Sequence, residues 1–168
     1  MARVACLDKK DAPWHLRWFY GVMRKMFEKD FTPAEIQMRL PRLVWGRIAV
    51  EAALGRRRIV SLRYIQLGKV RAASRVGCPF SVDVNSAVGR KAGVSDAKLL
   101  AVLSDERTPF NDTERVVIEL ADAMTDTPAN VSDDLYARLR KQFSEEQLMQ
   151  LGAQIAFENL SRTMEPNL

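Results

Sequence analysis

Residues 76–85 read VGCPFSVDVN, and this stretch marks the boundary between two helices. Gly77 is suited to end the first helix, because glycine readily adopts the left-handed conformation that follows a last helical turn. Pro79 is suited to begin the second helix, since its missing N–H would have no helical partner there. Cys78 is then the N-cap, with backbone N–H groups of the first turn directed at its sulfur. The positive end of the helix dipole also favours the thiolate, which is the reactive form of cysteine.

Helices are predicted on both sides of this boundary, and no segment alternates between apolar and polar residues as a strand would. Capping pairs mark several helix starts, including Asn111 with Glu114 and Ser144 with Gln147. We expect helices at about 14–28, 43–54, 59–76, 79–92, 95–103, 111–125 and 144–164, a further helix capped by Ser132, and a capping box at 32–35. The pattern predicts an all-α protein.

The composition indicates a globular protein with a real hydrophobic core. The chain has 168 residues, of which 47% are hydrophobic and 28% charged, and this suits one domain or one unit of an oligomer. No apolar run reaches the roughly 18 residues that cross a bilayer, and charged residues at 8–11 argue against a signal peptide. Cys6 and Cys78 lie far apart, and His15 is the one histidine. We therefore expect a cytoplasmic protein with neither metal nor cofactor.

Charge is distributed unevenly along the chain. Residues 1–93 hold 19 Lys and Arg against 7 Asp and Glu, whereas residues 94–168 hold 7 against 14. One interpretation is attraction of an anion, a nucleic acid or an acidic partner, with Arg56–Arg58 extended by arginines of the next helix. The interpretation we favour is that basic and acidic regions pair within the fold or oligomer, because the basic residues are spread over several helices. No nucleic-acid-binding motif is present, so neither nucleic acid nor membrane is expected as a partner.

The segment Arg63–Leu103 carries the pattern Cys-x-x-Ser-x-x-x-Asn, followed by AGVSD at 92–96. It resembles the core of the alkylhydroperoxidase D / carboxymuconolactone decarboxylase superfamily, and residues 111–148 resemble the C-terminal half of many such proteins. The resemblance implies an all-α helical bundle that forms a homo-oligomer, a trimer or a hexamer. It also implies one domain over 1–168, with an N-terminal helical extension at 1–55 and the superfamily core at 56–168.

The chemistry that this resemblance implies is thiol redox chemistry. In the family, two cysteines one turn apart reduce a hydroperoxide and form a disulfide, which a thioredoxin-like or lipoyl partner reduces, while a glutamate and a histidine relay protons. Cys78 matches the first cysteine, Ser81 the second, Asn85 the histidine and Gln66 the glutamate. A serine hydroxyl closes no disulfide, and neither amide takes up a proton near neutral pH.

Asp83 is a further candidate in the same stretch. It either supplies a carboxylate to the site or is a solvated residue near the helix start. The resemblance extends to a variant with Cys-Pro-Phe-Cys or Cys-Pro-Phe-selenocysteine followed by Asp and Asn. Ser81 is then either a natural loss or an engineered replacement of cysteine or selenocysteine.

Three functions remain open at this point. The first is a thiol-dependent antioxidant protein centred on Cys78, acting on a hydroperoxide or a small thiol or disulfide and impaired by Ser81. The second is a carboxymuconolactone decarboxylase-type lyase, which needs a proton donor that Gln66 and Asn85 do not provide. The third is a non-catalytic oligomeric binding protein on the same scaffold.

Overall fold

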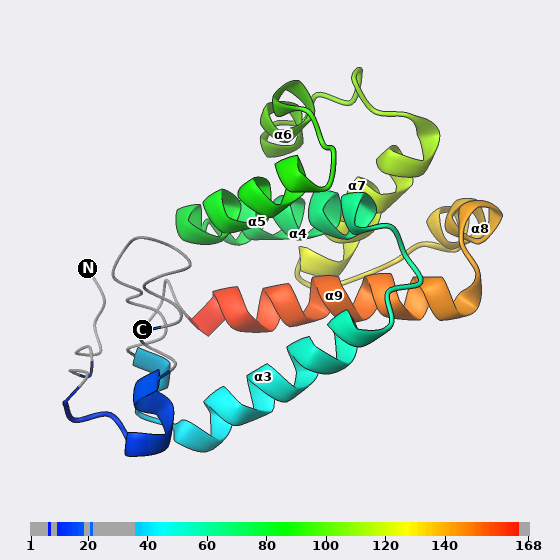
Figure 1. Ribbon diagram of the computed structural model, residues 1–168. Coiled ribbons are helices and arrows are strands. Elements are labelled where there is room, and N and C mark those ends of the chain that lie inside the picture. The colour runs from blue at the N-terminus through cyan, green and yellow to red at the C-terminus, as the bar shows by residue number, and fades with distance from the viewer. Residues whose placement is uncertain (1–6, 8–9, 19–20, 22–35, 165–168) are drawn as a thin grey trace. The chain divides into compact units, whose positions relative to one another are not determined.

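The computed structural model describes residues 7, 10–18, 21 and 36–164 (Figure 1). The chain divides into two compact units between Arg56 and Arg57, and each is described by itself. All regular elements in the described ranges are helices, in agreement with the all-α prediction.

The first unit contains the 3-10 turn η1 (Trp14–Leu16) and helix α3 (Pro41–Arg56). Its buried residues are Ala12, Leu16, Met38 and Val44. Helix α3 begins earlier and ends later than predicted: Gly55 does not close it, because the helix continues through Arg56. Most of the helix expected at 14–28 and the capping box expected at 32–35 lie outside the described residues.

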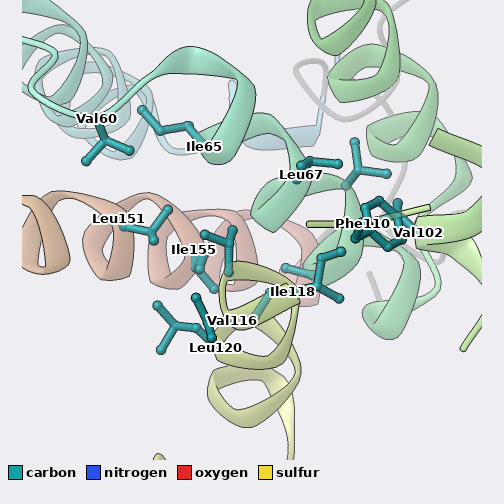
Figure 2. Close-up of a cluster of buried hydrophobic side chains, with 14 of the residues drawn as sticks. Val60, Ile65, Leu67, Val102, Phe110, Val116, Ile118, Leu120, Leu151 and Ile155 are labelled. Carbon is teal, nitrogen blue, oxygen red and sulfur yellow. The ribbon is translucent and has the colours of Figure 1, made fainter. Parts of the chain in front are cut away.

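The second unit is built around helix α4 (Leu62–Val76). It packs against α5 (Pro79–Lys91), α6 (Asp96–Leu103), α7 (Asp112–Thr125) and α9 (Glu145–Met164), while α8 (Asp133–Gln142) packs against α7 and α9. Figure 2 shows the core, in which Ile65 and Leu67 of α4 lie with Ile118 of α7 and Leu151 and Ile155 of α9. A helix covered by four others is buried around most of its circumference, which explains the apolar and small residues along α4.

Local signals place the helix ends in the second unit. Gly77 ends α4 in the left-handed conformation, with φ of 77°. Asn111 and Glu114 form the reciprocal capping box at the start of α7, and Ser132 caps α8 by accepting from the Leu135 N–H. Helix α4 begins later than the predicted residue 59. The residues just before α4 are held by Gln150, whose Oε1 accepts from the backbone N–H groups of Ile59 and Val60 at 3.0 Å each.

Basic side chains of α4 pair with acidic side chains from later in the chain. Arg71 is 4% exposed and contacts both Asp105 and Asp122, and Arg75 contacts Asp126. Arg63 donates to the buried Glu114. This pairing favours the interpretation that the basic and acidic regions neutralise each other within the fold.

No helix in the described ranges combines the length and the apolar character needed to cross a membrane.

Candidate thiol site at the start of helix α5

Cys78 and Ser81 contact each other at the first turn of α5. The Cys78 Sγ lies 3.2 Å from the Ser81 Oγ, and either atom can donate the hydrogen bond. Both residues are buried, Cys78 with 6% of its surface exposed and Ser81 with none. The backbone holds Cys78 from both sides, because its N–H donates to Ala73 of α4 and its carbonyl accepts from Ser81 and Val82 of α5. The two side chains therefore lie within one helical turn, at a corner that backbone hydrogen bonds hold on both sides.

The structure corrects one detail of the predicted N-cap. Cys78 occupies the N-cap position with φ of −104° and ψ of 93°, but its sulfur accepts no capping hydrogen bond from the backbone. The Ser81 N–H donates to the Cys78 carbonyl at 3.1 Å instead. The partial positive charge of the helix N-terminus remains beside the thiol, and the Ser81 hydroxyl is its direct polar contact.

Asn85 leads from this corner to a carboxylate that sequence analysis missed. The Asn85 Nδ2 donates to Oε1 of Glu158 in α9 at 3.0 Å. The other carboxylate oxygen of Glu158 lies 3.2 Å from the Lys69 Nζ of α4. Glu158 is only 2% exposed. A signal for it exists in the sequence, because Glu158 continues the apolar stripe of Leu151 and Ile155, where a carboxylate is out of place.

Gln66 lies on α4, one turn before Lys69, and is 5% exposed. Among the described residues, its Oε1 is the one buried side-chain nitrogen or oxygen without a hydrogen-bond partner. A Cβ added to Gly89 of α5 would lie 3.7 Å from the Gln66 Cβ, so the two helices approach closely here. Gln66 thus lies beside Gly89, near the C-terminal end of the buried face of α5.

The structure does not bring Asp83 together with the other site residues. Its side chain is exposed, whereas Ser81 and Asn85 on either side of it are buried. Residues two apart on a helix point in nearly opposite directions, so Asp83 lies on the solvent face. It also follows the first turn, which contains no acidic residue. Cys6 lies outside the described residues.

The arrangement has defined chemical possibilities. A thiol and a hydroxyl one turn apart form no disulfide, but two thiols at these positions would meet the Cα separation of less than about 7 Å that a disulfide requires. The carboxylate of Glu158 is able to exchange a proton, which the amides of Gln66 and Asn85 are not. No cluster of three or more His, Cys, Asp or Glu side chains that would suit a metal ion occurs in the part of the chain that the structure describes.

Sequence comparison finds relatives for about half of the chain. No family model matches. The uncharacterized protein YnjA of Escherichia coli is 41% identical over 97 residues, which is 56% of this chain and 53% of YnjA. The uncharacterized protein YdfG of Bacillus subtilis is 30% identical over 88 residues, or 51% of this chain and 60% of YdfG. The chain thus spans little more than half the length of the curated relatives it matches.

Structural comparison covers more of the chain. A protein of unknown function from Agrobacterium tumefaciens, named a candidate antioxidant defence protein AhpD, is 25% identical with a TM-score of 0.69, over 75% of this chain and 87% of that one. The debrominase Bmp8, as a cysteine-to-alanine variant with 2,3,4-tribromopyrrole, has a TM-score of 0.80 at 17% identity over 100% of this chain and 91% of that one. A peroxidase-related protein from Silicibacter has a TM-score of 0.77 at 15% identity, over 96% and 88%. The chain has the all-α fold of AhpD-like and peroxidase-related proteins.

Proposed function

We propose that this chain is a thiol-dependent oxidoreductase of the alkylhydroperoxidase D / carboxymuconolactone decarboxylase superfamily, centred on Cys78. The observation that carries the proposal is the 3.2 Å contact between Cys78 Sγ and Ser81 Oγ, buried at the start of α5. The fold shared with a candidate antioxidant defence protein supports it. The substrate class is a hydroperoxide or a small thiol or disulfide.

Position 81 decides how far the reaction proceeds. With a thiol there, its sulfur attacks the terminal oxygen of a hydroperoxide and the O–O bond breaks. The alcohol leaves, and position 81 becomes a sulfenic acid. The Cys78 sulfur then attacks the sulfenic sulfur, forming the disulfide and releasing water. A dithiol partner, thioredoxin-like or lipoyl-like, supplies two electrons and two protons, which returns both thiols and leaves the partner as a disulfide.

With Ser81, only part of this cycle is available. The hydroperoxide oxidises Cys78 alone to a sulfenic acid and is itself reduced to the alcohol. The sulfenic acid then condenses with an external thiol to a mixed disulfide and water. Ser81 has no sulfur to attack that mixed disulfide, so an external thiol must release it. We therefore propose an impaired antioxidant protein that turns over little peroxide, acting in the cytoplasm as a homotrimer or homohexamer.

The test compares three proteins by their consumption of an organic hydroperoxide with a dithiol reductant present. They are the parent chain, Ser81→Cys, and the matched control Ser86→Cys, which adds a cysteine at another buried position of α5. Residues 78 and 86 are about 12 Å apart along the helix axis, too far for a disulfide. We expect turnover by Ser81→Cys alone.

Turnover by Ser86→Cys as well would show that any added thiol suffices, and the redox-pair proposal would fail. Inactivity of a folded Ser81→Cys protein would also refute it.

Glu158 gives a specific reason to keep the lyase as a second candidate. Decarboxylation of a lactone needs a group that exchanges a proton, and Glu158 is such a group beside Asn85. This candidate predicts conversion of a carboxylated lactone that persists in Cys78→Ser, whereas the redox proposal predicts that all activity depends on Cys78. Absence of both activities would leave the non-catalytic binding protein.

A further inference from the structure

Three helices converge on the carboxylate of Glu158. Asn85 of α5 donates to one oxygen and Lys69 of α4 pairs with the other, while Glu158 itself belongs to α9. Glu158 is 2% exposed and the Lys69 side chain 19%. Burying a charged carboxylate is costly unless it is paired and hydrogen-bonded, and both conditions are met here. The carboxylate is therefore held in one position by a partner on each oxygen.

Asn85 links this carboxylate to the helix that carries position 81. Ser81 and Asn85 are one turn apart on the buried face of α5, about 6 Å along the helix axis. A hydroperoxide whose reacting oxygen lies between them would contact position 81 on one side and the Asn85–Glu158 pair on the other. The Asn85 amide does not take up or release a proton near neutral pH, whereas a carboxylate such as that of Glu158 can act as an acid or a base.

We propose that Glu158 is the acid–base residue of the thiol site, an inference that rests on the proposed redox function. In the Ser81→Cys protein, the proton of the added thiol passes to the Glu158 carboxylate as the thiol attacks the hydroperoxide. When the O–O bond breaks, that proton passes to the alkoxide, which leaves as an alcohol. Lys69 and Asn85 are positioning residues, and the Lys69 charge also stabilises negative charge that develops on the leaving oxygen.

The experiment uses the full chain with the thiol moved from position 78 to 81, by combining Ser81→Cys with Cys78→Ser. Hydroperoxide is added once, and the sulfenic acid that forms is trapped with a cyclic diketone. Its rate of formation is followed by mass spectrometry of the tryptic peptide Val76–Arg90. Adding Glu158→Gln is expected to slow this step by about 100-fold or more, the usual effect of a general acid–base group. The matched control Glu146→Gln, on the exposed first turn of the same helix, is expected to leave the rate unchanged.

A second variant separates proton transfer from stability. Glu158→Gln leaves the Lys69 charge without its carboxylate, and a damaged fold would also slow the reaction. Lys69→Met together with Glu158→Gln removes both charges, which restores the charge balance but not the carboxylate. We expect this protein to unfold at the same urea concentration as the protein that carries only Ser81→Cys and Cys78→Ser. We also expect the thiols of the two proteins to react at the same rate with a neutral haloacetamide. Its sulfenic acid is still expected to form slowly.

Recovery of the rate of sulfenic acid formation when Lys69→Met is added to Glu158→Gln would overturn the role of Glu158, because the Lys69–Glu158 pair would then be structural. An unchanged rate in Glu158→Gln would overturn it too, while the redox function stands. Absence of sulfenic acid in the background protein itself would refute the redox function and this role together.

Discussion

Glu114 supports the sharpest prediction about stability. It is fully buried, caps α7 by accepting from the Asn111 N–H at 3.0 Å, and pairs with Arg63 and Lys98. Burial alone would raise the pKa of Glu114, but hydrogen bonds from Lys98, from the Asn111 N–H and from Arg63 outweigh it and hold the pKa below its usual range. The ionised form is therefore stabilised by folding.

Glu114→Gln removes this charge and keeps the shape of the side chain. The amide oxygen still accepts from the Asn111 N–H, so loss of the cap does not add to the effect. Arg63 and Lys98 lose their buried counter-charge, and breaking a buried pair costs about 3–5 kcal/mol. Their side chains are 35% and 19% exposed, so water compensates in part. We expect the free energy of unfolding to fall by about 3 kcal/mol at neutral pH, at the low end of that range.

Urea denaturation at a series of pH values tests this. Because the folded pKa of Glu114 is depressed, its contribution is complete above the unfolded pKa of about 4.3 and is lost as the pH falls through the folded pKa. The difference between the parent and Glu114→Gln should therefore be largest near neutral pH and shrink below about pH 4. A difference that stays constant across this range, or that is absent at neutral pH, would refute the reasoning.

Three further substitutions have expected effects on the urea unfolding midpoint. Gly68→Ala should destabilise by about 1–3 kcal/mol, because the new Cβ would lie 3.2 and 3.3 Å from two carbons of Ile155 in the closely packed α4–α9 contact. Gly77→Ala should cost about 1–2 kcal/mol, since φ of 77° is unfavourable for a residue with a Cβ. Gln66→Met should stabilise by about 1 kcal/mol, because it removes a buried acceptor that has no partner.

Each of these has a result that would contradict it. Adding Ile155→Val to Gly68→Ala should recover part of the loss, and no recovery would locate the strain elsewhere. An unchanged unfolding midpoint in Gly77→Ala would mean that the backbone at residue 77 adopts another conformation without cost. Destabilisation by Gln66→Met would mean that its Oε1 has a partner in solution.

The helix boundaries around the site follow from local signals. Gly77 in the left-handed conformation and Pro79 at the first helical position are adjacent in sequence, so the corner that holds Cys78 was predicted and is present. The capping box of Asn111 and Glu114 is equally local. The predicted start of α4 was too early, because Gln150, some 90 residues away, binds the backbone N–H groups of Ile59 and Val60.

The contacts of the candidate site were predictable only where they are local. The spacing of Cys78 and Ser81 places them one turn apart, and the structure shows the contact. The pair of Asn85 and Glu158 is separated by 73 residues, and such a contact depends on how α9 packs rather than on any motif. The sequence pattern also left Asp83 open, although helical periodicity alone directs it away from its buried neighbours.

The most direct test of the redox pair is the covalent state of positions 78 and 81 after oxidation. The Ser81→Cys protein is treated with one equivalent of hydroperoxide and digested with trypsin in the absence of reductant. The mass of its peptide Val76–Arg90 is then compared by mass spectrometry with that of the parent peptide. The expected result is a peptide lighter by two hydrogen atoms that regains them with a dithiol, while the parent peptide carries oxygen or an external thiol instead. A Ser81→Cys peptide that keeps both thiols or gains only oxygen would contradict the proposed function.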